Sequence, residues 1–304
     1  MSYAYDLSEE LKLPILMRVV TRMAHSRAVV KTASVREPNE INNNADPSNF
    51  ILLPVNARRR YAELVSQQTR LENLSEESPY NRYAIPEKPE KRGIVACGIG
   101  WNYVNECFPE GCHIPCLKIS QYPLPQKLLR DMAEKCEEII VVEDGQPFVE
   151  EQLRGILPTR CNIVGRLSGL LPRAGELTPD NVAQALGMRP AVPHTASQVV
   201  VPRPPALCQG CGHRDVYAAI NEIVAEMPTA KVFGDIGCYT LGALPPFRAI
   251  DSCVDMGASI TMAKGAADAG LFPAIAIIGD STFTHSGMTG LLDAVNCNLS
   301  LIHI

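Results

Sequence analysis

The chain has 304 residues, of which 46% are apolar, and its 28 Lys and Arg against 33 Asp and Glu leave a formal charge of −5. A chain of this length and composition is expected to form two or three compact globular units. The negative charge argues against nucleic acid as a partner, because no excess of basic residues is present to neutralise phosphates. Met1–Glu10 has no basic leader and the apolar run at 274–278 is far too short for a bilayer, so we expect a cytoplasmic protein and no membrane association.

Eleven cysteines are present, and their odd number and irregular spacing argue against a secreted disulfide framework. Cys107, Cys112 and Cys116 lie in a stretch with Gly and Pro that has no standard zinc spacing, so we expect no metal there. Free cysteine packs as a small apolar residue, and the sequence context predicts this role for four others: Cys97, Cys136, Cys161 and Cys297. Metal or cluster ligation remains to be considered for the cysteines further along the chain.

Residues 1–33 combine a short helical pattern at Leu7–Leu13 with an apolar run at Pro14–Val20 that is typical of a buried strand. A helix and a strand cannot bury a core unaided, so we expect these residues to be the end of a domain that starts earlier in a longer protein. Residues 34–92 are polar and contain several prolines, which predicts a linker. Apolar residues at helical spacing, with many arginines, predict a surface helix at 56–74 within this linker.

Residues 93–189 alternate short apolar strands with helices, which predicts βαβ organisation in one domain. The clearest strands are Ile94–Ala96 and Ile139–Val142, and a helix is expected between them at Gln126–Cys136. Thr178 is followed directly by a proline, so we expect it to be the N-cap of the helix that closes this domain.

A proline-rich hinge at 190–207 leads into the most informative segment, residues 208–298. Cys208 and Cys211 form a Cys-x-x-Cys turn at the start of a helix, where the helix dipole and backbone N–H groups stabilise thiolates, as zinc or an iron–sulfur cluster requires. Cys238 lies in the glycine-rich turn after a later strand and is able to join them. From spacing alone, cluster binding and a buried, inert turn are equally open.

A second candidate site follows the apolar run Ala274–Ile278, which is expected to be a strand leading into Gly279-Asp280-Ser281-Thr282. A carboxylate at the carboxyl end of a buried parallel strand, beside a glycine and two hydroxyl groups, is suited to hold a phosphate-bound Mg2+. The alternative is an ordinary N-capping aspartate in a βα loop. The small residues that begin Met256–Ala263 indicate a helix that closely approaches another backbone or a ligand.

Four blocks in this segment, in this order, resemble the thiamine-diphosphate-binding domain of the 2-oxoacid:ferredoxin oxidoreductases, most closely the alpha subunit of the indolepyruvate branch. They are Cys208-x-Gly-Cys-x-His-Arg214, Gly234-Asp-Ile-Gly-Cys-Tyr-Thr240, Met256-Gly-Ala-Ser259, and Gly279-Asp-Ser-Thr-Phe283 followed by His285-Ser-Gly287. Residues 1–33 resemble the end of the family's pyrimidine-binding domain, and residues 93–189 resemble its transketolase-C-terminal-like domain. The resemblance implies an α/β fold of mostly parallel sheets flanked by helices over nearly the whole chain.

The resemblance also implies roles for individual residues, residue by residue. Asp280 matches the ligand of the Mg2+ that bridges the diphosphate of thiamine diphosphate, and its neighbours match residues that shape this turn or line the diphosphate pocket. These cofactor-binding neighbours are Gly237, Cys238, Gly257, Gly279, Ser281 and Thr282.

The three cysteines at positions 208, 211 and 238 match ligands of a [4Fe-4S] cluster near the thiamine, whose fourth ligand would follow this chain. His213 matches a position that faces the substrate or the cofactor, although a structural histidine at a helix start is an equal alternative. The family's activating glutamate would precede this chain, so we expect a fragment that is truncated at both ends, inactive alone and poorly soluble.

The implied activity is the oxidative decarboxylation of aryl pyruvates such as indolepyruvate to aryl-acetyl-CoA. Thiamine diphosphate, coenzyme A and ferredoxin are the implied cofactor, acyl acceptor and electron acceptor, and a beta subunit is the implied partner. One alternative is a relative that acts on pyruvate or 2-oxoglutarate, or a non-oxidative thiamine decarboxylase. Another is a non-catalytic zinc-binding module at Cys208, Cys211 and His213. Residues 299–304 match the translated end of a sequencing transposon, so we expect an artefact there.

Overall fold

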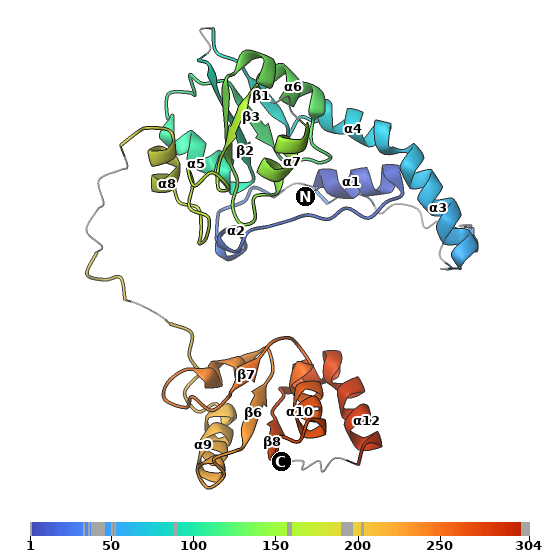
Figure 1. The fold of residues 1–304 in the computed structure, drawn as a ribbon, viewed down its shortest axis with the longest axis vertical. Coiled ribbons are helices and arrows are strands. Elements are labelled where there is room, and N and C mark those ends of the chain that lie inside the picture. Colours follow the sequence, from blue (N-terminus) through green and yellow to red (C-terminus); the bar gives the residue numbers. More distant parts are fainter. Residues whose placement is uncertain are drawn as a thin grey trace. The chain divides into compact units, whose positions relative to one another are not determined.

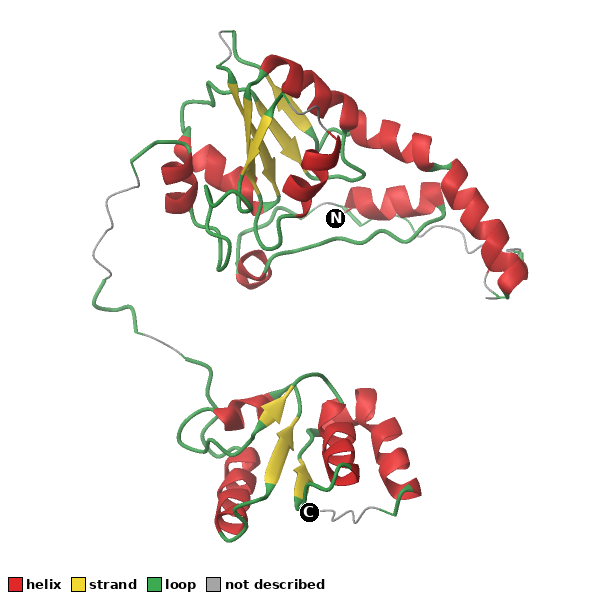
Figure 2. Cartoon of the chain, viewed as in Figure 1, coloured by secondary structure: helices red, strands yellow, loops and turns green. Residues whose placement is uncertain are grey.

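The computed structural model describes residues 2–32, 34–35, 37, 46–49, 51, 53–87, 90–156, 160–189, 197–201 and 204–298. The chain divides into two compact units, Met1–His194 and Thr195–Ile304 (Figures 1 and 2). Each unit contains one sheet of mostly parallel strands flanked by helices, which confirms the predicted α/β fold class. The predicted artefact at 299–304 lies outside the described residues.

The first unit is built on a five-stranded sheet in the order β1-β3-β2-β4-β5, in which β1 alone runs antiparallel to its neighbour. The two predicted strands lie within β2 and β4, whose residues are almost all buried. The strands of this sheet are β1 (Arg82–Ala84), β2 (Arg92–Cys97), β3 (Cys116–Ile119), β4 (Glu138–Val142) and β5 (Asn162–Val164).

Helices cover both faces of this sheet, with α6 and α7 on one face and α5 and α8 on the other (Figure 1). Thr178 is an N-cap as predicted, because its side chain accepts a hydrogen bond from the backbone N–H of Asn181 at 3.2 Å. The helices are α1 (Ser2–Leu11), α2 (Thr21–His25), η1 (Pro47–Asn49), α3 (Pro54–Ser66), α4 (Gln68–Glu76), α5 (Ile99–Cys107), α6 (Gln126–Lys135), α7 (Phe148–Ile156) and α8 (Pro179–Ala185).

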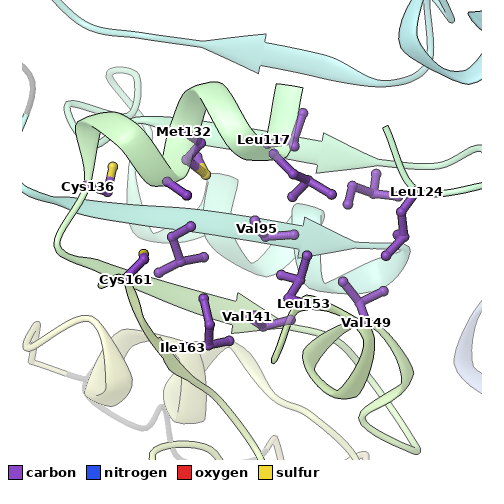
Figure 3. Packing of buried hydrophobic residues seen from close by; sticks show 14 of the residues in the cluster. Val95, Leu117, Leu124, Met132, Cys136, Val141, Val149, Leu153, Cys161 and Ile163 are labelled. Carbon is purple, nitrogen blue, oxygen red and sulfur yellow. The ribbon is translucent and has the colours of Figure 1, made fainter. Parts of the chain in front are cut away.

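Two apolar cores form because successive side chains of a strand point to opposite faces of the sheet. Val95 of β2 packs with α6 and α7 on one face (Figure 3). Ile94 packs with α5 and α8 on the other face. Of the four cysteines predicted to be core residues, Cys97, Cys136 and Cys161 are buried in the first of these cores, whereas Cys297 is exposed in the second unit.

The N-terminal half differs from the sequence-based expectation in two places. Pro14–Val20 is not a strand, and Leu16 within it is 96% exposed. Arg82–Ala84 lies within the segment expected to be a linker, but it forms the edge strand β1. This strand pairs with β3, and Ala84 lies opposite Cys116. A strand as short as three residues has too little sequence pattern to be recognised locally, and its pairing depends on the distant β3.

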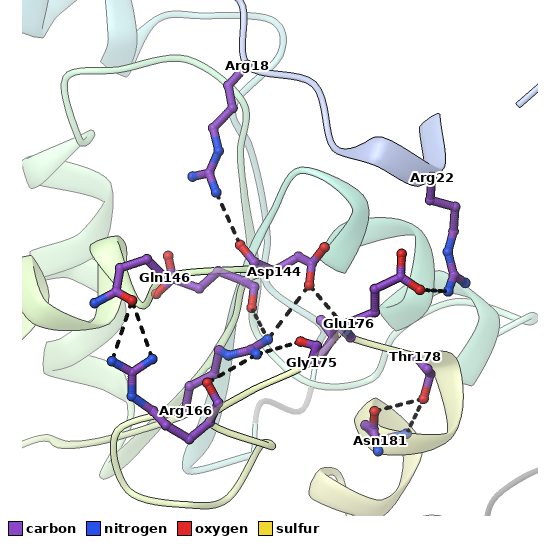
Figure 4. Close-up of polar contacts among 12 residues, drawn as sticks. Arg18, Arg22, Asp144, Gln146, Arg166, Gly175, Glu176, Thr178 and Asn181 are labelled. Carbon is purple, nitrogen blue, oxygen red and sulfur yellow. Dashed lines mark hydrogen bonds and ion pairs between the residues drawn. The ribbon is translucent and has the colours of Figure 1, made fainter. Parts of the chain in front are cut away.

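A polar network holds the N-terminal segment against the carboxyl ends of the strands in the first unit (Figure 4). Arg166 is only 2% exposed, and its guanidinium lies 3.7 Å from the carboxylate of Asp144. Arg18 donates a hydrogen bond to the backbone oxygen of Asp144, and Arg22 forms an ion pair with Glu176 at 2.7 Å. Residues 14–25 are therefore positioned by polar contacts of their side chains and not by pairing with a strand.

The second unit has a three-stranded parallel sheet in the order β7-β6-β8. Its strands are β6 (Lys231–Gly234), β7 (Ser252–Cys253) and β8 (Ala274–Ala276), so the strand expected at 274–278 is confirmed over its first three residues. None of the helices that the structure describes is long and apolar enough to cross a membrane. The helices here are α9 (Gly212–Ala225), η2 (Cys238–Ala243), α10 (Ala258–Asp268), α11 (Asp280–Thr282), the π-helix η3 (Phe283–Gly287) and α12 (Met288–Asn296).

Candidate functional site

The candidate site lies at the carboxyl edge of the β7-β6-β8 sheet. Because β6 and β8 are parallel neighbours, the turns that follow them emerge at the same edge. A side-chain hydrogen bond joins these two turns, since the hydroxyl of Thr282 donates to the backbone oxygen of Ile236 at 3.0 Å. The structure therefore brings together the turn around Gly237 and the turn at 279–282, which the sequence blocks assigned to one site.

The turn after β6 is held by its own polar groups. Gly237 has a φ of +146°, and its backbone N–H donates to the hydroxyl oxygen of Thr240 at 3.1 Å. The same hydroxyl donates to the backbone oxygen of Asp235 at 3.0 Å, which closes the turn. Cys238 follows Gly237 at the start of η2, and its side chain is exposed.

Asp235 is the functional candidate that the sequence-based predictions missed. Its side chain is 1% exposed and accepts three backbone hydrogen bonds, from Ile236 at 3.0 Å, Gly257 at 2.7 Å and Ser259 at 3.0 Å. A signal was present in the sequence: the chain has two Gly-Asp pairs, each after an apolar strand, and only the second, with Asp280, was assigned a role.

The first turn of α10 lies against the backbone of η3. Gly257 has a φ of +87°, and a Cβ at this position would lie 2.7 Å from the backbone oxygen of Ser286. The hydroxyl of Ser286 in turn donates to the backbone oxygen of Met256 at 2.8 Å. The sequence indicated that the small residues at the start of this helix allow close approach to another backbone or to a ligand. The structure shows the close approach to another backbone.

Asp280 begins α11, with residues 277–279 between it and the end of β8, and its side chain is exposed. It is not the N-cap of this helix: that position is Gly279, and no side chain caps the helix. Among the described residues, the carboxylate of Asp280 takes part in no hydrogen bond or ion pair, so both oxygens are available to a cation. Ser281 beside it is also exposed, whereas Thr282 is buried by its contact with the other turn.

Cys211, His213 and Tyr239 form a small cluster beside this edge. The sulfur of Cys211 lies 3.4 Å from Nδ1 of His213, and the imidazole stacks on the ring of Tyr239 with 4.0 Å between ring centroids. Burial raises the pKa of Tyr239, and the nearby Cys211 and Asp280 raise it further. His213 is thus placed close to the turn that contains Cys238, and it packs on protein rather than standing free.

The cysteines expected to hold a cluster are not gathered into a metal site. Cys208 and Cys238 are exposed, and Cys211 contacts His213. Within the described part of the chain, no group of three or more His, Cys, Asp or Glu side chains is placed to hold a metal ion. The Cys208, Cys211 and His213 set of the zinc alternative is therefore not assembled either.

The residues at this edge fit a diphosphate with its Mg2+ in two respects. The unpaired carboxylate of Asp280 provides the oxygen ligand that Mg2+ prefers. The hydroxyl of Ser259 is buried and has no hydrogen-bond partner among the described residues, which leaves one polar group unsatisfied next to Asp235.

Comparison with known proteins connects this edge to a described family. Residues 235–304 match the family model described as "Thiamine pyrophosphate enzyme, C-terminal TPP binding domain". The chain is 34% identical over 97% of its length to "Indolepyruvate oxidoreductase subunit IorA" of Methanothermobacter thermautotrophicus, and covers 50% of that protein. It is 33% identical over 96% of its length to the protein of the same name from Archaeoglobus fulgidus, and covers 49% of it.

These comparisons confirm the resemblance that the four sequence blocks predicted. The chain spans about half the length of the curated relatives that it matches. A solved 2-oxoglutarate:ferredoxin oxidoreductase from Magnetococcus marinus aligns over 38% of this chain and 21% of its own, at 15% identity and a TM-score of 0.30.

Proposed function

We propose that this chain is part of a thiamine-diphosphate-dependent 2-oxoacid oxidoreductase that decarboxylates aryl pyruvates such as indolepyruvate. The observation that carries the proposal is the exposed carboxylate of Asp280, which has no hydrogen-bond or ion-pair partner within the described part of the chain. It lies next to a glycine-rich turn to which Thr282 bonds. The match of residues 235–304 to a thiamine pyrophosphate enzyme domain supports the cofactor, and the names of the relatives support the substrate.

The residues at the sheet edge would share the binding of the cofactor's diphosphate. Asp280 would bind the Mg2+, and the backbone of Gly279 and Ser281 would provide donors at the start of a helical run that continues through α12. Gly237 and Cys238 would line the opposite side of the pocket. Gly257 would contribute by its lack of a side chain, since its N–H already donates to Asp235.

When bound, thiamine diphosphate supplies the electron sink that decarboxylation of a 2-oxoacid requires. The chain's own part is to orient this cofactor and to place charged and polar groups beside it. His213, stacked on Tyr239, is proposed to face the substrate or cofactor side of the turn. Coenzyme A, ferredoxin and a beta subunit are proposed partners. An iron–sulfur cluster at Cys208, Cys211 and Cys238 would require these cysteines to come together, because the described residues do not gather them into a metal site.

Substitution of Asp280 tests the cofactor assignment in the full-length protein with its partner subunit. Asp280→Asn removes the charged oxygen ligand, and the apparent Kd of thiamine diphosphate with Mg2+, measured by calorimetry, is expected to rise at least about 100-fold. The matched control is Asp293→Asn, because Asp293 is an exposed aspartate on α12 that lies 3.6 Å from Lys264. Cofactor binding by Asp280→Asn at the wild-type Kd would contradict the proposal.

The substrate is tested separately by comparing indolepyruvate, phenylpyruvate and pyruvate with a viologen dye as electron acceptor. We expect both aryl pyruvates to be oxidised faster than pyruvate. A preference for pyruvate would overturn the aryl assignment and leave the cofactor assignment intact. Stoichiometric zinc without iron in anaerobically purified protein would instead favour a zinc-binding module at Cys208, Cys211 and His213.

A further inference from the structure

We propose that Asp235 is a positioning residue: it holds the first turn of α10 against the turn after β6 before any cofactor is bound. This inference rests on the proposed function, because the two turns that Asp235 joins belong to the proposed diphosphate site. It also changes which backbone groups are available to the diphosphate.

The carboxylate of Asp235 bridges two elements that are distant in the sequence. One oxygen, Oδ1, accepts from the backbone N–H of its neighbour Ile236 at 3.0 Å and from Gly257 at 2.7 Å. The other, Oδ2, accepts from Ser259 at 3.0 Å. The side chain is 1% exposed, and no Lys, Arg or His among the described residues pairs with it. Its charge is therefore held by backbone donors alone, as buried carboxylates can be.

In this arrangement, a carboxylate of the protein itself already occupies the N-terminus of α10. The first N–H groups of a helix have no partner within the helix and attract anions. Here the N–H groups of Gly257 and Ser259 already donate to Asp235, so a phosphate would have to displace a buried carboxylate to use them. The donors left for a diphosphate are those of the turn after β6 and of the helical run that starts at Asp280.

Asparagine is the informative replacement because it keeps the shape and removes one acceptor. In Asp235→Asn, only the amide oxygen could still accept a hydrogen bond. The NH2 group would face a backbone N–H donor of α10. A buried donor left without an acceptor destabilises the local arrangement. The first turn of α10 should therefore loosen, although residues 231–234 of β6 keep their sheet pairing.

A matched control is available in the same turn. Asp255 is exposed, and its carboxylate accepts from the backbone N–H of its neighbour Met256 at 2.7 Å. Asp255→Asn therefore removes the same charge two residues from Gly257, without touching the link between β6 and α10.

The test uses the full-length protein with its partner subunit and two readouts. In Asp235→Asn, hydrogen exchange of residues 256–260 without cofactor should accelerate, and the apparent Kd of thiamine diphosphate should rise about tenfold or more. Asp255→Asn should match the wild type in both measurements.

Three results would overturn the inference: unchanged exchange at 256–260 in Asp235→Asn, an unchanged Kd, or rapid exchange of the Gly257 and Ser259 amides in the wild type. The wild-type measurement needs no variant, so it decides the matter even where Asp235→Asn does not fold. Failure of the wild type to bind thiamine diphosphate would instead contradict the proposed function, while the exchange data would still report whether Asp235 holds α10.

Discussion

At the scale of single residues, the pKa of a cysteine thiol depends on the groups that surround it. Burial raises the pKa of the Cys97 thiol well above its usual range. Cys112 is half-buried, and a hydrogen bond from the Cys116 thiol lowers its pKa to about 7. The pKa of Cys116 is raised by the same interaction and by burial. Cys112 is thus the thiol of this pair that ionises near neutral pH.

The corresponding prediction concerns the pH dependence of alkylation. Because the thiolate is the reactive form, the rate at which iodoacetamide labels Cys112 should rise with pH and reach half its maximum near pH 7, whereas Cys97 should stay unlabelled. Cys116→Ala removes the donor and should move the midpoint toward the ordinary thiol value of 9.0. Cys116→Ser keeps a donor and should not. Peptide mass spectrometry measures these rates, and a wild-type midpoint near pH 9 would contradict the assignment.

At the scale of elements, the position of α10 is set by its first turn, which packs against the backbone of η3. Gly257 adopts a positive φ, and its missing side chain makes room for the backbone oxygen of Ser286. Backbone atoms cannot rotate away as a flexible side chain can. In the same helix, Gly265 is exposed, and a Cβ at that position would have no neighbouring heavy atom within 4 Å.

Alanine at these two glycines should therefore have opposite effects on the free energy of unfolding. Gly257→Ala combines positive-φ strain with a steric clash and should destabilise the protein by about 2 kcal/mol or more. Gly265→Ala should stabilise it by about 0.5–1 kcal/mol, because alanine favours a helix interior over glycine. Urea denaturation followed by circular dichroism measures both. A Gly257→Ala variant as stable as the wild type would mean that α10 does not lie against η3 as described.

At the scale of the whole molecule, the second unit combines a small core with several large apolar side chains that are exposed. Among its described residues, nine hydrophobic side chains are buried, and four of them are alanines: Leu207, Tyr217, Ala230, Val232, Ala249, Ile260, Ala263, Ile277 and Ala294. Along α12, Met288, Leu292 and Val295 share one helix face and are 60%, 62% and 49% exposed. An apolar stripe of this kind is typical of a surface that further protein covers.

Self-association of the isolated 304-residue chain should follow from this stripe. Leu292→Gln should lower the concentration-dependent increase in light scattering and change the free energy of unfolding by less than about 0.5 kcal/mol, because the side chain is mostly exposed. Thr289→Gln, at an exposed polar position on the same helix, is the control and should leave scattering unchanged. Equal association of the wild type and Leu292→Gln would show that this stripe is not responsible.

Much of the candidate site could be predicted from the sequence, because its signals are local. Asp280 follows closely after an apolar strand and stands beside a glycine, so its place at a sheet edge follows from a few nearby residues. Asp235 has the same local signal, but its importance depends on Gly257 and Ser259, which are 22 and 24 residues away. Pairings over that distance leave no periodic trace in the sequence.

The sequence by itself determined the α/β class, the strands around Ile94 and Ile139, and the helix cap at Thr178, because each depends on the side-chain pattern of a short stretch. Only the tertiary structure decided that residues 14–19 stay exposed, that Arg82–Ala84 joins a sheet, and that Cys211 contacts His213. Each of these outcomes is set by which distant backbone or side chain offers a partner, and that is a property of the packed chain.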